Sequence, residues 1–145
     1  MGLLRDLQTA IGDRLRADAV FAETPSVEVY EEDRHDIDAE VLRATSKAGI
    51  AVAVTTPFLR PSEDLPELAE ATVIVEITEN VLVNRGPAGT KKTWLTICEA
   101  IHVLLVNWSP PGGWSAMRFG GQEQVAPGRP IIANFTLTTT ALLRT

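Results

Sequence analysis

The side chains best suited to chemistry in this sequence are a cysteine and a histidine four residues apart, Cys98 and His102. On a helix this spacing places both side chains on the same face. A neighbouring imidazole can lower the pKa of a thiol and accept its proton, which is how thiol-dependent enzymes prepare their nucleophile. However, Cys98 lies among apolar residues, and no Asn or Asp is identifiable as the group that would orient the imidazole. We therefore interpret the pair as a core cysteine beside a helix-edge histidine, with a small thiol-dependent enzyme as the weaker alternative.

Residues 31–40, EEDRHDIDAE, form a strongly acidic segment that holds the other histidine. His35 with Asp33, Asp36 and Asp38 offers imidazole and carboxylate groups of the kind that bind divalent metals. The segment lacks the glycine that an EF-hand loop requires, and the cysteine lies on another predicted element. Mutual repulsion of the carboxylates favours exposure to solvent unless a cation or a basic partner neutralises them. We therefore expect a solvent-exposed loop or a partner-facing patch here, with no metal and no cofactor.

Three tryptophans are candidates for an aromatic binding surface. Trp94 and Trp108 fall on the apolar stripe of a predicted helix, which indicates core packing. Trp114 lies between glycines and a short predicted strand, and we expect it to make an exposed contact. The glycine pairs at 112–113 and 120–121 do not form a phosphate-binding loop, because neither has the GxxxxGKS/T or GxGxxG spacing.

The composition predicts one compact globular domain over residues 1–145. Apolar residues make up 45% of the chain and charged residues 22%, values far from those of disordered proteins. A chain of this length buries roughly 68–70% of the surface that it exposes when unfolded. The single cysteine excludes an internal disulfide and suits a reducing compartment.

The formal net charge of -6 gives no general attraction to phosphate backbones or anionic lipids. We therefore expect neither specific nucleic-acid binding nor membrane binding, although Arg14 with Arg16, or Lys91 with Lys92, offers a local basic patch. No apolar run approaches the roughly 20 residues of a membrane-spanning helix, and the first residues lack the apolar core of a secretory signal. These features predict a protein that is assembled in the cytoplasm.

The elements that must position these residues are two helices and a sheet. Residues 90–108 gather their large apolar side chains on one broad face, which predicts a central buried helix with Thr90 as its N-cap. The first eighteen residues repeat leucine or isoleucine every three or four positions, which predicts an amphipathic helix. We predict a single α+β domain in which these two helices pack a mainly antiparallel twisted sheet.

The predicted strands alternate apolar and polar residues. Pro25 sets the start of the first strand, which we place at a sheet edge. Pro57, Pro61 and Pro66 divide a polar loop after the second strand, because proline cannot donate to a strand ladder. A glycine turn at 120–121 is predicted to join two short strands as a hairpin. The predicted strands are residues 26–31, 49–56, 71–84, 114–120, 122–126 and 131–143.

Two of these strands are longer than a small sheet needs. We expect the distal half of 71–84 to project as a hairpin arm or to lie in a subunit contact. The polar face of 131–143 is rich in threonine and almost uncharged. Such a face suits a sheet surface that another subunit covers.

This order of elements resembles that of the tail-terminator and minor tail proteins of tailed bacteriophages. The resemblance lies in an N-terminal amphipathic helix, a strand, an acidic loop, two long strands, a central helix beginning TKKTWLTICEAIHVLL and a closing hairpin ending NFTLTTTALL. It covers most of the chain and rests on the order and texture of the elements.

The resemblance implies a small protein without an active site that assembles as a ring, usually a hexamer, on the last ring of tail-tube subunits. Such a ring stops tube elongation and presents a surface for head attachment. The implied partners are further copies of the chain, the tail-tube protein and a head-tail connector or neck protein, and the implied location is the head-proximal end of the virion tail. A head-tail connector or other neck component is the alternative, and it would differ mainly in its place in the particle.

A ring needs one patch of each subunit to contact a different patch of the next. Complementary charge between the acidic segment and a basic patch is one way to set the ring's register, so reversing the charge at Asp36 and Asp38 is expected to impair assembly. The candidate subunit-interface residues are Arg14, Arg16, Asp33, Asp36, Asp38, Glu76, Thr78, Lys91, Lys92, Trp114, Thr136 and Thr138.

Overall fold

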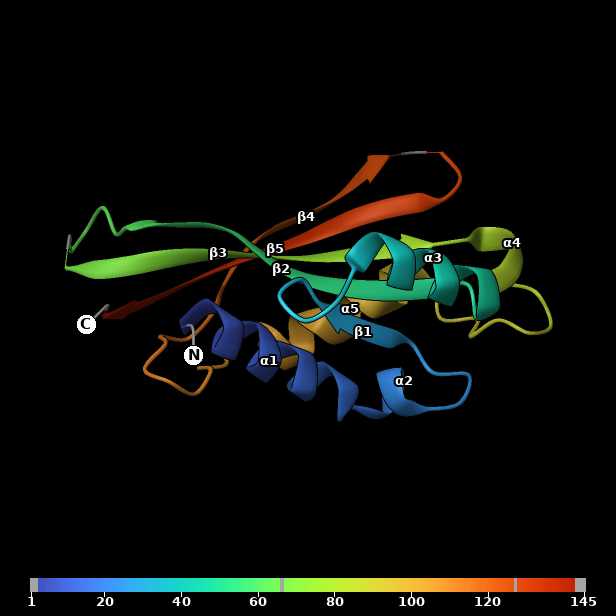
Figure 1. Ribbon diagram of the computed structural model, residues 1–145, viewed down its shortest axis with the longest axis horizontal. Coiled ribbons are helices and arrows are strands. Elements are labelled where there is room, and N and C mark those ends of the chain that lie inside the picture. Colours follow the sequence, from blue (N-terminus) through green and yellow to red (C-terminus); the bar gives the residue numbers. More distant parts are fainter. Residues whose placement is uncertain (1–2, 66, 127, 143–145) are drawn as a thin grey trace.

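A twisted five-stranded sheet with the strand order β1-β2-β3-β5-β4 runs along the molecule (Figure 1). The computed structural model describes residues 3–65, 67–126 and 128–142. β1 runs parallel to β2, whereas the other neighbouring strands pair antiparallel, so the predicted α+β class and the edge position of β1 are confirmed. The elements are α1 (Leu3–Arg16), α2 (Ala19–Ala22), β1 (Glu28–Glu31), α3 (Ile37–Lys47), β2 (Ile50–Pro61), β3 (Leu68–Glu79), α4 (Val81–Asn84), α5 (Trp94–Leu105), β4 (Arg118–Ala126) and β5 (Ile131–Leu142).

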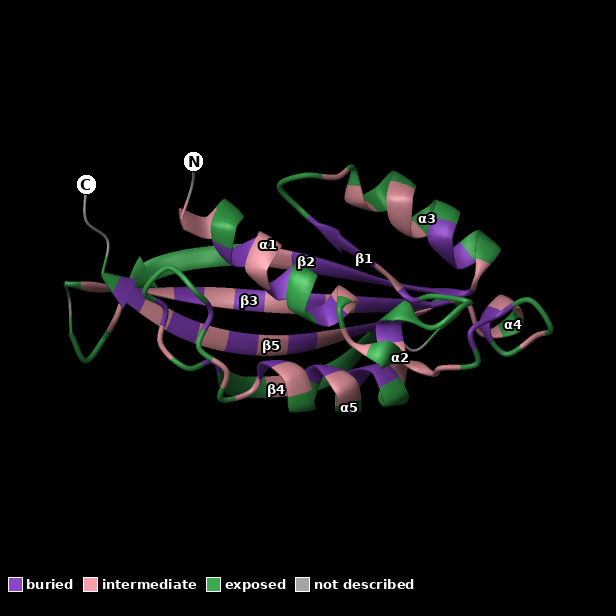
Figure 2. Ribbon diagram, turned by 90° about the horizontal axis from the view of Figure 1, so that it is seen from below, coloured by how far each residue is buried: buried purple, intermediate pink, exposed green. Residues whose placement is uncertain are grey.

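The main apolar core lies on the face of the sheet that α1, α2 and α5 cover (Figure 2). α1 contributes Leu7, Ile11 and Leu15, which are fully buried as their spacing predicts. α5 contributes Ile97 and Ile101 from its own buried stripe. These side chains pack on the inward residues of β2, β3 and β5. The two predicted helices therefore cover the same face of the sheet.

α5 is shorter than the predicted helix at 90–108, and its N-cap is Thr93 rather than Thr90. The Thr93 hydroxyl accepts a hydrogen bond from a backbone N–H of the first turn at 3.4 Å. Thr90 instead donates its hydroxyl proton to the Asn84 side chain and is buried in the turn before the helix. At the other end Val106 is extended and Asn107 has a φ of 67°, so the chain leaves the helix before Trp108.

α3, a helix that the sequence pattern did not predict, covers the opposite face of the sheet at one end. Its small core joins Ala44 to Tyr30 of β1 and Ala51 of β2. The prediction of a loop over residues 31–40 is therefore wrong from residue 37 onwards. Asp36 caps the helix by accepting a hydrogen bond from a backbone N–H, and the carboxylates of the first turn are stabilised by the helix dipole.

β2 continues through the prolines that were predicted to end it. Its register against β3 shifts between Thr55 and Phe58, which places Pro57 in a bulge where its missing N–H costs no ladder hydrogen bond. Pairing then resumes as far as Pro61, opposite Ala69. The polar loop is therefore much shorter than predicted, and the far halves of β2, β3 and β5 extend beyond the helices as an arm (Figure 1).

β3 ends at Glu79, and the segment predicted to be its distal half forms the short helix α4. The part of β3 that projects is its first half, not its second. The Glu79 carboxylate is fully buried and accepts hydrogen bonds from Asn84 Nδ2 at 2.8 Å, Arg85 Nε at 3.2 Å and Trp94 N at 3.1 Å. One charged side chain thus joins the end of β3, the turn after α4 and the start of α5.

The predicted hairpin with a glycine turn at 120–121 is also wrong, because β4 is one strand that pairs with β5. The glycines occupy a register shift between Phe119 and Gly121, where Gly121 adopts a φ of 120°. Residues 114–117 precede the strand as irregular chain. The closing hairpin of the predicted topology is nevertheless present, with β4 and β5 as its strands.

Replacing Glu79 should destabilise the fold strongly. In Glu79→Ala the Arg85 guanidinium, the Asn84 amide and the first N–H of α5 lose their common acceptor. Arg85 is half exposed and can turn to water, but each buried donor left without an acceptor costs about 1–3 kcal/mol. Chemical denaturation measures the change, with Glu123→Ala on the exposed surface of β4 as the control. A loss at Glu79 no larger than that of the control would contradict the role assigned to this carboxylate.

Candidate assembly interface

The thiol of Cys98 is buried inside the core, with 1% of the residue exposed. Burial raises the pKa of the Cys98 thiol to about 11, the opposite of what a nucleophilic thiolate needs. His102 lies on the exposed side of α5, where its ring meets the Phe119 ring edge-on with 5.2 Å between centroids. No hydrogen bond joins the two side chains in the described part of the chain. The structure therefore places this pair as a core cysteine and a helix-edge histidine.

The predicted metal ligands of the acidic segment are dispersed over separate contacts. Asp33 pairs with Arg5 of α1, Asp36 caps α3, and Asp38 lies in the first turn of that helix. His35 Nδ1 lies 3.6 Å from the Glu31 carboxylate. Among residues 3–65, 67–126 and 128–142, no three of the residue types that bind metals lie close enough together to hold an ion.

Glu31 is fully buried although it belongs to the segment predicted to be solvated. Its carboxylate pairs with Arg16 of α1, and Arg34 approaches it at 3.9 Å. The side-chain oxygen of Gln8 accepts a hydrogen bond from the N–H of Asp33 at 2.9 Å. These contacts fasten the turn after β1 to α1, so Arg16 stabilises the fold of its own chain and its guanidinium is already occupied.

The other predicted basic residues are also separated by the structure. Arg14 is exposed, its guanidinium lies 4.7 Å from the centre of the Trp108 ring, and its Nε donates to the carbonyl of Leu104 at 2.6 Å. Lys92 donates to the carbonyl of Val20 at 2.6 Å. Lys91 is exposed, and its backbone has a φ of 62°. Arg14 and Lys92 are therefore each engaged by contacts within their own chain.

A broad polar surface is present where no described helix covers the sheet. We call it the open sheet face, because α3 shields this side mainly at its β1 and β2 end. Its outward side chains are half-buried by their neighbours on adjacent strands and come mainly from β3 and β5. The open sheet face consists of Thr72, Ile74, Glu76, Asn134, Thr136 and Thr138.

Two groups on the open sheet face are poorly satisfied. Burial raises the pKa of the Glu76 carboxyl, and the negative charge of Asp38 adds to the effect. Asn134, which lies opposite Glu76 in the sheet register, has a buried side-chain oxygen without a hydrogen-bond partner among the described residues. Thr78, at the end of the same row, is buried. A covering surface that donates hydrogen bonds would satisfy these groups.

Trp114 does not make the exposed contact that the sequence analysis expected. Only 4% of the residue is exposed, and it joins the main core as part of the segment that precedes β4. The same segment binds the arm, where the Thr139 hydroxyl donates to the Ser115 carbonyl at 2.6 Å. This part of the chain therefore covers the inward face of β5, and the flanking glycines gave no sign of that role.

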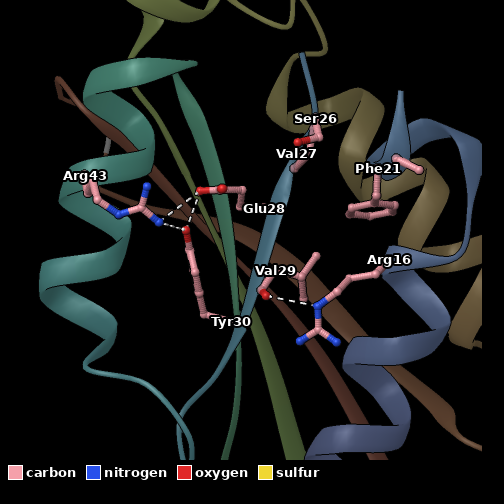
Figure 3. Close-up of a pocket in the computed structure, with 9 residues that line it drawn as sticks. Arg16, Phe21, Ser26, Val27, Glu28, Val29, Tyr30 and Arg43 are labelled. Carbon is pink, nitrogen blue, oxygen red and sulfur yellow. Dashed lines mark hydrogen bonds and ion pairs between the residues drawn. The ribbon is translucent and has the colours of Figure 1, made fainter. Parts of the chain in front are cut away.

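A pocket lies beside β1, between α2 and α3 (Figure 3). It has a volume of about 340 Å³. Its polar groups already bind one another: Arg43 donates to the Tyr30 hydroxyl at 2.9 Å, that hydroxyl donates to Glu28, and Arg16 Nε donates to the carbonyl of Val29 at 3.3 Å. Burial and the Glu28 carboxylate raise the pKa of the Tyr30 hydroxyl, so it stays protonated. The arrangement favours a structural crevice over a reaction site.

Exposed apolar side chains at the two ends of the molecule were not predicted as interface residues. Phe58 and Leu65 lie on or near the arm, and Leu42 and Leu82 lie on α3 and α4 at the other end. Their positions depend on the bulge in β2 and on two helices that the sequence pattern did not reveal. Surface leucines have no sequence signal of their own, because the alternation that marks a strand or a helix says nothing about what covers it.

The comparisons with known proteins show a likeness to a solved structure. No family model and no curated protein matches the chain. A chain in a structure of the "Virion of native gene transfer agent (GTA) particle" is similar over 97% of this chain and 97% of its own length, with 18% sequence identity and a TM-score of 0.62. At this identity the likeness shows a shared fold over the whole chain. In the described residues, no helix combines the length and the apolar character of a membrane span.

Thiol labelling tests the placement of Cys98. Under native conditions at pH 8 we expect a small thiol reagent to react far more slowly than it does after unfolding, because the sulfur is buried and its pKa is raised to about 11. Val103→Cys, on the exposed side of the same helix, provides a fast-reacting control. Equal rates at both positions in the folded protein would restore the thiol-enzyme hypothesis.

Proposed function

We propose that this protein is a structural component of a phage-like virion and, more specifically, a tail terminator that caps the tail tube as a ring. The observation that carries the proposal is the shared fold along 97% of both chains with a component of a gene transfer agent virion. The order of elements that resembles the phage tail-terminator and minor tail proteins supports the same function. In this proposal the ring stops tube elongation and offers a surface to a head-tail connector or neck protein.

A structural rather than catalytic function agrees with the chemistry of the side chains. The thiol is buried and protonated, and the polar groups of the pocket beside β1 bind one another. The buried charges Glu31 and Glu79 are each held by groups of their own chain and stabilise the fold. These residues explain stability without requiring a substrate.

The open sheet face is the surface that we propose lies between subunits of the ring. Its half-buried threonines pack flat against a neighbour more readily than charged side chains would, and the unpartnered oxygen of Asn134 would gain a donor. Contact with a hydrogen-bond donor would also offset the desolvation of the Glu76 carboxyl, which is already partly removed from water. We propose that Arg14 and Asp38, which are exposed, take part in neighbouring contacts, and that six copies close the ring.

A head-tail connector or neck protein is the second candidate. The shared fold with a virion component favours both candidates equally, and the difference lies in which partner the ring binds. A terminator binds the end of the tail tube, whereas a connector binds the head side and leaves tube growth unchanged.

Tube assembly in vitro distinguishes these functions. Tail-tube protein that polymerises in the presence of this protein should give shorter tubes with a ring at one end, visible by electron microscopy of negatively stained samples. The variant Thr136→Arg, which places a charge on the open sheet face, should lose this activity while keeping its circular dichroism spectrum. Tubes of normal length without a terminal ring would contradict the terminator, and binding to isolated neck complexes in that case would support the connector.

A further inference from the structure

The two ends of this elongated molecule carry opposite charge. At the turn between β2 and β3, Glu63, Asp64 and Glu67 are exposed and form no ion pair with another described residue. Leu65 lies among these carboxylates with 49% of the residue exposed. We call residues 63–65 and 67 the arm tip, which lies at the left end of Figure 1.

The other end of the molecule has a pocket that suits such a tip. This end pocket has a volume of about 230 Å³ and lies between α3, α4 and the turn that joins β4 to β5. Leu42 and Leu82 form its apolar rim, with 68% and 71% of each residue exposed. Arg129 lines it as an exposed cation. Its described lining is Leu42, Thr45, Ser46, Asn80, Val81, Leu82, Arg129 and Pro130.

Arg129 and Lys47 at this end lack the internal pairing that the described residues show elsewhere. Arg129 forms no ion pair with a described residue, and neither does Lys47, which ends α3 close by. No acidic side chain is among the described residues that line the end pocket. By contrast, Arg16 and Arg43 beside β1 are already held by Glu31, Glu28 and Glu40. The end pocket is therefore the better site for an external acidic group.

Charge segregation of this kind matters because the whole chain is acidic. Copies with a formal net charge of -6 repel one another on average, so close association requires that unlike regions meet. The arm tip supplies exposed carboxylates around one apolar side chain, and the end pocket supplies a cation beside two leucines. A contact between them would bury apolar surface and bring opposite charges together.

We propose that the arm tip of one copy docks in the end pocket of a second copy. The arm tip and the end pocket both belong to this chain. They lie at opposite ends of its long axis, so they cannot contact each other within one molecule (Figure 1). The contact joins two different patches, so it continues from copy to copy and closes as a ring when the rotation between subunits allows. This inference rests on the proposed homo-oligomeric function and names the contact that orders its subunits.

Disulfide trapping tests the contact in the full chain. In a Cys98→Ala background, Leu65→Cys is combined with Leu82→Cys, and mild oxidation should yield covalent dimers and higher multimers on non-reducing gels. The matched control combines Leu65→Cys with Val103→Cys, which is equally accessible on α5. Multimers from the first pair alone support the proposal, whereas equal yields or no multimers from both pairs overturn it.

Charge reversal separates this inference from the proposed function. Glu63→Lys with Glu67→Lys, or Arg129→Glu alone, should reduce the trapped multimers, and combining the reversals should restore them. If the wild-type protein forms rings whose mass none of these changes alters, the inference is wrong and the ring function stands. If the Leu65→Cys and Leu82→Cys pair yields no multimers and the wild-type protein forms no rings with tail tubes, both are wrong. Trapping of the tip on the tube protein instead of a second copy would also overturn the inference.

Discussion

The buried carboxylate of Glu79 accepts hydrogen bonds from three separate segments at the point where β3 ends. Asn84 and Arg85 hold the chain as it turns through α4, and the N–H of Trp94 ties the start of α5 to the same two oxygens. Gly49 permits this arrangement, because a Cβ there would lie 2.2 Å from the backbone of Asn84. The direction in which α5 crosses the sheet is therefore set at one charged residue, and the core beneath the helix depends on it. A carboxylate without these donors would be costly in a dry site.

Because α5 and α1 pack on one face of the sheet, the rest of the sheet is available for other contacts. α3 covers one end of the opposite face, and the strands continue past the helices as an arm. The uncovered part carries threonines and few charges, while exposed carboxylates lie at the arm tip and Arg129 lies at the opposite end. A subunit built in this way has unlike surfaces for unlike neighbours, as the heterologous contacts of the proposed ring require.

The parts of this fold that follow from local patterns could be predicted from the sequence, and the parts set by distant contacts could not. The repeat of Leu7, Ile11 and Leu15 and the alternation along β5 show a buried face directly. Pro57 was predicted to end the strand, because the sequence gives no sign of the bulge opposite β3. Thr90 was predicted to cap the helix, because the sequence gives no sign of its tertiary hydrogen bond to Asn84. For the assembly surfaces, the threonine row was visible as a pattern. The burial of Trp114 and the occupation of Arg16 by Glu31 depended on the folded neighbours.

The mass of the protein in solution, measured by light scattering alone and after mixing with tail tubes, tests the central claim of self-assembly most directly. We expect a discrete species whose mass is a fixed multiple of the chain mass, formed either by the protein alone or once tube ends are present. A protein that keeps the mass of a single chain at high concentration and ignores the tubes would contradict it.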